Sequence, residues 1–125
     1  MFWRKKKSDD PVSEAIEFFN TSFQTVVACK EGFVRNGLQA EFTSVQHAGA
    51  IFLVWSSNLN IAGNPANIPK LIEGFVASAT SFLDACDKLA AHPSSSDDVR
   101  TMVDALKRTA GNVVAVVREE YKGTE

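Results

Sequence analysis

The chain has 125 residues, a formal net charge of −2, 45% hydrophobic residues and 22% charged residues. These values are typical of one globular domain and exclude an intrinsically disordered chain. The near-neutral charge also excludes a protein whose whole surface attracts nucleic acid or anionic lipid.

The N-terminal stretch is aromatic and basic, and we expect residues 1–10 to form a flexible tail ahead of a bundle over residues 11–125. No apolar run follows the cations, so no secretory signal is expected. Two aromatic residues followed by four cations are typical of a weak membrane-surface anchor, and a solvated tail is the alternative. The candidate membrane-surface residues are Phe2, Trp3, Arg4, Lys5, Lys6 and Lys7.

The first predicted helix covers residues 11–35. It starts at Asp10-Pro11, where an acidic cap precedes proline at the first helical position. Its apolar residues recur at steps of three and four and form one stripe. Asn36-Gly37 predicts the end of this helix, because both residues tolerate the left-handed conformation.

The second predicted helix covers residues 38–60. Its apolar run from Ala48 to Trp55 is well short of the roughly 20 residues that span a bilayer. Its main apolar seam alternates steps of four and three, as in a coiled coil. This seam comprises Leu38, Phe42, Val45, Gly49, Phe52, Ser56 and Leu59.

The third and fourth predicted helices cover residues 69–91 and 97–122, and both carry apolar residues at helical spacing. Ser95, with Asp98 three residues later, resembles a weak capping box before the fourth helix. Four such helices with short connections predict an all-α fold, an antiparallel up-down-up-down four-helix bundle. We expect a cytoplasmic protein of bacterial type, in which both cysteines are unpaired and packed as small hydrophobic residues.

A second stripe on the predicted helix over 38–60 is the most informative feature of the sequence. It is displaced by roughly 140–180° from the main seam, where a helix of a monomeric bundle should be polar. We therefore predict a partner-binding face, used by a homodimer or by the helix of a protein partner. Cover by Phe2 and Trp3, or by the loop 61–68, is the alternative. The predicted partner-binding residues are His47, Ala50, Ile51, Val54, Asn58 and Ile61.

His47 raises a second hypothesis, because histidine phosphotransfer domains are four-helix bundles with a solvent-facing histidine on a long helix. The chain resembles them in size and in having small residues after His47. Members of that family usually carry lysine three residues and glycine four residues after the histidine, where this chain has Ala50 and Ile51. A phosphotransfer protein that uses His47 is therefore kept as an alternative function.

Enzymatic, metal and cofactor sites are not expected. The sequence has no Glu-x-x-His pair, no zinc-site spacing of cysteine and histidine, and no nucleophile elbow. Acidic residues nearly cancel the basic residues of the last helix, so no nucleic-acid partner is expected. The nine phenylalanines leave one further alternative, a carrier of a small apolar ligand in the bundle core. The sequence thus favours a non-enzymatic interaction module.

Overall fold

The computed structural model describes residues 10–60 and 65–121, and over these residues it contains helices and no strand. The predicted all-α class is therefore confirmed for the described part of the chain. The helices are α1 (Pro11–Val27), α2 (Lys30–Arg35), α3 (Gln39–Asn60), the 3-10 helix η2 (Pro65–Asn67), α4 (Ile68–Ala91) and α5 (Asp97–Glu120).

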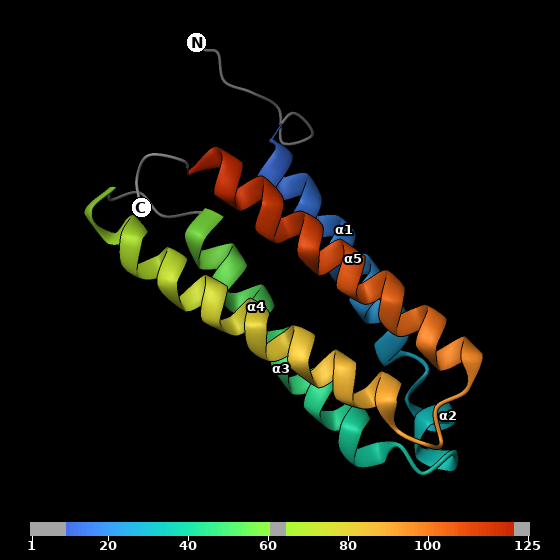
Figure 1. Cartoon of the computed structure of the whole chain (residues 1–125). Helices are drawn as coiled ribbons and strands as arrows, with labels where there is room; N and C mark the ends of the chain where they lie inside the picture. The colour runs from blue at the N-terminus through green and yellow to red at the C-terminus, as the bar shows by residue number, and fades with distance from the viewer. Residues whose placement is uncertain (1–9, 61–64, 122–125) are drawn as a thin grey trace.

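The four long helices pack in two pairs. Figure 1 shows α1 beside α5, and α3 beside α4. The two pairs meet where α4 packs on α5 and α1 packs on α3, while the short α2 contacts α3. Each long helix thus buries its apolar stripe against two neighbours.

The predicted helix over residues 11–35 is in fact two helices, α1 and α2, separated by a turn at Ala28 and Cys29. Continued helical spacing from the buried Val26 would bring Lys30 onto the apolar stripe, where a charge is unfavourable. The turn leaves Lys30 exposed and lets Phe33 enter the core. There the Phe33 ring stacks on Phe42 of α3, with 4.6 Å between centroids. The stacked pair thus holds α2 against α3.

Helix α1 begins as the sequence predicts. The Asp10 carboxylate accepts hydrogen bonds from the backbone N–H of Val12 at 3.0 Å and of Ser13 at 3.4 Å, which satisfies two of the free donors of the first turn. The Ser13 hydroxyl in turn accepts a hydrogen bond from the side-chain amide of Asn60, the last residue of α3. This cap thus fastens the start of α1 to the end of α3.

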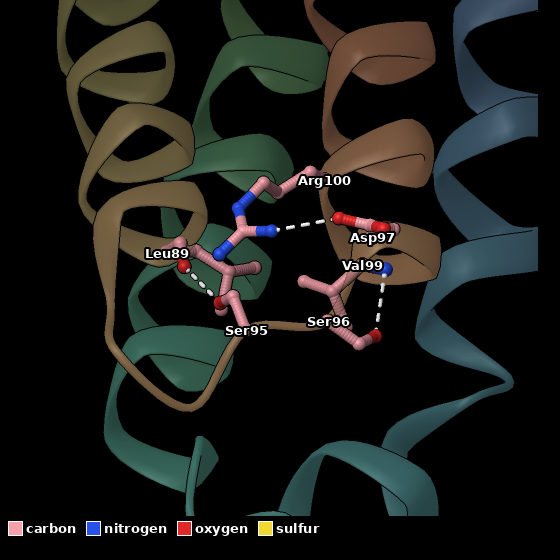
Figure 2. A network of polar contacts seen from close by, with 6 residues as sticks. All are labelled: Leu89, Ser95, Ser96, Asp97, Val99 and Arg100. Atoms are coloured by element: carbon pink, nitrogen blue, oxygen red, sulfur yellow. Dashed lines mark hydrogen bonds and ion pairs between the residues drawn. The ribbon is translucent and has the colours of Figure 1, made fainter.

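The connection between α4 and α5 differs by one residue from the sequence-based expectation (Figure 2). Ser96, not Ser95, caps α5: its hydroxyl accepts a hydrogen bond from the N–H of Val99 at 3.2 Å. The buried Ser95 hydroxyl instead donates to the carbonyl of Leu89 near the end of α4. Ser95 therefore satisfies a free carbonyl of one helix while Ser96 caps the next.

The core is aromatic on one side and aliphatic on the other. Five buried phenylalanine rings from three helices contact one another with centroid distances of 5.1–6.2 Å. Helix α5 buries valine, leucine and alanine side chains and Thr109, and it adds no aromatic ring to the cluster. The aromatic cluster consists of Phe19 and Phe23 of α1, Phe52 of α3, and Phe75 and Phe82 of α4.

The predicted main seam of α3 is confirmed, because all seven of its residues are buried. Gly49 is required by close packing: a Cβ atom placed there would lie 2.3 Å from the Phe23 ring. Ser56 is accommodated because its hydroxyl donates a 2.7 Å hydrogen bond to the carbonyl of Phe52. Close packing thus explains the glycine of the seam, and a hydrogen bond to the backbone explains the serine.

Candidate functional site

The second stripe of α3 lies on the outside of the molecule. His47, Ala50 and Asn58 are exposed, and so are the apolar side chains of Ile51 and Val54, at 40% and 57%. The sixth predicted residue, Ile61, lies outside the described residues. Helix α3 therefore presents five of the six predicted positions on one outward face, which we call the α3 outer face.

The α3 outer face carries no charged residue. From Phe42 to Asn60 the sequence has no Asp, Glu, Lys or Arg, and Glu41 in the first turn is the only acidic residue of the helix. Helix α5 is different, since it carries both acidic and basic residues at exposed positions. Solvated helix faces are normally charged, whereas the centres of protein interfaces are depleted of charge. The α3 outer face thus has the composition of an interface.

A shallow depression of about 440 Å³ adjoins this face, between α3 and α4. Gly74 of α4 lets the indole of Trp55 pack closely on α4, because a Cβ atom at Gly74 would lie 2.4 Å from the ring. Apolar atoms of Ile51 and Trp55 form one rim of the depression. Its lining is completed by His47, Ala48, Gly74, Ala77, Ser78 and Ser81.

His47 combines exposure with a place beside this depression. An exposed imidazole is one requirement of phosphoryl transfer, but Ala50 and Ile51 follow it, so no cation lies one turn along the helix. The phosphotransfer function therefore stays a prediction. The alternative function, a carrier of a small apolar ligand in the bundle core, also stays a prediction. The five rings of the aromatic cluster pack on one another.

The candidate membrane-surface residues, Phe2, Trp3 and Arg4 to Lys7, lie outside the described residues. None of the helices over residues 10–60 and 65–121 combines the length and apolar character that a membrane span needs. Within the same residues, no group of three or more His, Cys, Asp or Glu side chains is placed to hold a metal ion.

The two cysteines are unpaired and differ in environment. Burial, with a contribution from the charge of Asp87, raises the pKa of the Cys86 thiol to about 12. Cys29 is exposed at the turn between α1 and α2, so the prediction that both cysteines pack as small hydrophobic residues is wrong for Cys29. Because the thiolate is the reactive form, Cys86 should be inert in the folded protein.

We therefore expect a thiol reagent such as DTNB to modify Cys29 in the native protein and Cys86 only after denaturation. The release of thionitrobenzoate, followed by absorbance with and without denaturant, measures this. Cys29→Ser should abolish the native reaction and leave the reaction of the denatured chain at half its size. Rapid native modification of the Cys29→Ser variant would contradict the buried position of Cys86.

A second exposed apolar site was missed by reasoning from the sequence. Phe18 of α1 is 62% exposed and lines a depression of about 380 Å³ between α1 and α5. The signal was present, because Phe18 lies one residue from the stripe that Phe19 occupies. The other lining residues are Pro11, Glu14, Ala15, Asn112 and Val116.

Over residues 10–60 and 65–121 the chain is thus a small all-α protein with exposed apolar side chains on α3 and between α1 and α5. The chain matches no protein-family model, and neither the curated proteins nor the solved structures compared with it give a match. The functional argument therefore rests on the chain's own residues.

Proposed function

We propose that the chain is a non-enzymatic interaction module that forms a homodimer through the α3 outer face. In this proposal it is a cytoplasmic, bacterial protein whose four long helices form an antiparallel up-down-up-down bundle. The observation that carries the proposal is the α3 outer face itself, where exposed Ile51 and Val54 lie on a helix without a charged residue after Glu41. Exposed apolar surface of this kind is typical of interaction sites.

A second copy of the chain fits this face better than a charged partner. The face has no carboxylate or cation to pair with, so charge complementarity cannot select a partner there. In a two-fold dimer each copy offers both an exposed apolar side chain, Val54, and the depression lined by Trp55. His47 and Asn58 flank the apolar residues and offer hydrogen-bonding groups to the other copy. The face therefore supplies both halves of a self-complementary contact.

The dimer predicts a sharp effect of one surface substitution. Val54→Asp should convert the dimer into a monomer, because an unpaired charge would be buried at the centre of the contact. A penalty of about 3 kcal/mol or more weakens the dimer at least about a hundredfold. Sedimentation velocity or light scattering over a dilution series measures the change in mass.

Val34→Asp provides the matched control. Val34 is also an exposed valine, at 40%, but it lies on α2 and not on the α3 outer face. The Val34→Asp substitution should leave the measured mass that of the dimer. A wild-type chain that is monomeric throughout the series would overturn the proposal, as would a Val54→Asp variant that stays dimeric.

A further inference from the structure

The α3 outer face has the same spacing of residues in both directions along the helix. Four of its exposed residues are His47, Ile51, Val54 and Asn58. The steps between them are four, three and four residues, so the order of steps is unchanged when the helix is reversed. Ile51 and Val54 flank the midpoint of the set, and the two outer residues each lie about 8 Å from it along the helix axis. Two copies that meet antiparallel therefore bring each member of the set opposite another member.

This symmetry identifies which residues meet in the dimer. On the basis of the homodimer proposed above, we propose that two copies pair their α3 helices antiparallel. In this register Ile51 of each copy lies against Val54 of the other, and His47 of each copy lies against Asn58 of the other. A two-fold contact contains each such pair twice, once on either side of the axis. The two pairs of His47 and Asn58 thus enclose an apolar centre to which each copy contributes Ile51 and Val54.

The contact formed in this register contains no charged group from α3. From Phe42 to Asn60 the helix carries no Asp, Glu, Lys or Arg, so two copies meet there without repulsion between like charges. A neutral imidazole has one donor and one acceptor, and the amide of asparagine has groups of both kinds. His47 can therefore form a hydrogen bond with Asn58 of the second copy, which satisfies polar groups that the contact removes from water.

Side-chain size favours the antiparallel direction. Trp55 lines the depression beside the face, and Ala50 lies as far from the midpoint on the other side. In the antiparallel register the indole of each copy therefore meets the small Ala50 of the other, and large against small packs well. A parallel pair would place Trp55 against Trp55 and Ala50 against Ala50, which crowds one level of the contact and leaves a gap at another. Helix dipoles also favour antiparallel neighbours, because opposite ends then lie side by side.

Crosslinking of introduced cysteines distinguishes the two directions. The background is Cys29→Ser, which leaves only the buried Cys86. In the antiparallel dimer, the new cysteines of His47→Cys alone or of Asn58→Cys alone lie about 16 Å apart along the axis, too far for a short bismaleimide. The double variant His47→Cys/Asn58→Cys brings each new cysteine beside one of the second copy. We therefore expect crosslinked dimer on a denaturing gel from the double variant, and none from the single variants or from the control Val34→Cys.

Crosslinked dimer from either single variant would show parallel pairing and overturn the register. A double variant that sediments as a dimer and gives no crosslink would overturn it too. Failure of the homodimer itself has a different signature, since the wild-type chain would then be monomeric in sedimentation velocity and Val54→Asp would leave its mass unchanged.

A pair of charges tests the same contact without a crosslinker. His47→Lys and Asn58→Glu should each weaken the dimer, because the introduced charge loses water and gains no partner. In the double variant His47→Lys/Asn58→Glu, each introduced lysine would lie against an introduced glutamate of the second copy. Two such pairs should make the dimer about tenfold tighter than in either single variant, by sedimentation velocity over a dilution series. A double variant no tighter than the single variants would contradict the antiparallel register.

Discussion

Phe19→Ala is expected to lower the free energy of unfolding by about 3–5 kcal/mol, the range for removing a buried aromatic ring. Phe19 is fully buried, and its ring centroid lies 5.1–5.6 Å from those of Phe23, Phe52 and Phe82. Alanine would leave a cavity among three rings that come from three helices. For a chain of this size the melting temperature should fall by about 10–20 °C. Thermal and urea unfolding followed by circular dichroism measure both quantities.

The neighbouring residue supplies the control. Phe18→Ala removes the same side chain from the same helix, but Phe18 is 62% exposed. Its effect on the free energy of unfolding should stay near about 0.5 kcal/mol, as for most surface substitutions. Equal effects of the two substitutions would contradict the orientation of α1.

Gly49→Ala is expected to destabilise the protein, although alanine favours helices. The new Cβ would lie 2.3 Å from the Phe23 ring, which is held by stacking on Phe19 and by edge contact with Phe82. Such overpacking costs about 1–3 kcal/mol, and at this distance the upper part of the range applies. The better helix propensity of alanine returns about 1 kcal/mol. The net loss in free energy of unfolding should therefore be about 1–2 kcal/mol by urea denaturation.

Gly111→Ala, in contrast to Gly49→Ala, is expected to raise the free energy of unfolding. Gly111 lies inside α5 and is exposed, and a Cβ atom added there would extend into open space. The substitution should stabilise the protein by about 0.5–1 kcal/mol.

Phe23→Leu should partly relieve the destabilisation caused by Gly49→Ala, so that the double variant is more stable than the sum of the single effects predicts. Stabilisation by Gly49→Ala, or strict additivity with Phe23→Leu, would contradict the close contact.

The regular part of the fold can be predicted because helical spacing is a local property. The seam from Leu38 to Leu59 repeats every three or four residues, and each of its members is buried. The cap at Asp10 is equally local, since donor and acceptor lie two or three residues apart. Burial of one helix face and capping at its start thus need no knowledge of the rest of the chain.

Other features depend on contacts between distant residues. The break after Val27 cannot be inferred from spacing alone, because Phe33 keeps a plausible register on a continuous helix. The gain from stacking Phe33 on Phe42 arises only when α3 is in place. The choice of Ser96 over Ser95 as cap follows from the bond between Ser95 and Leu89, six residues earlier in the chain. A tertiary contact decides the first case, and a hydrogen bond across the turn between α4 and α5 decides the second.

The candidate site likewise has one part that local spacing predicts and one part that depends on contacts between helices. Periodicity places His47, Ile51 and Val54 on one face of α3, and the structure shows that face exposed. The depression beside it needs Gly74 of α4 to lie against Trp55, a pairing that spacing within α3 cannot reveal. The exposure of Phe18 depends on how α1 packs on α5, which spacing within α1 does not reveal.

The pairing of the first long helix with the last has a consequence for synthesis on the ribosome. Helices α3 and α4 are neighbours in sequence and can associate as soon as both have emerged, because little chain must be ordered to join them. Helix α1 emerges before α3 and α4 but has α5 as a main neighbour, and α5 is made after them. Until then the side of α1 that packs on α5 stays exposed to chaperones and to other nascent chains, whereas Phe19 and Phe23 can already contact Phe52 of α3 and Phe82 of α4. A pause in translation before residue 97 would prolong this vulnerable interval.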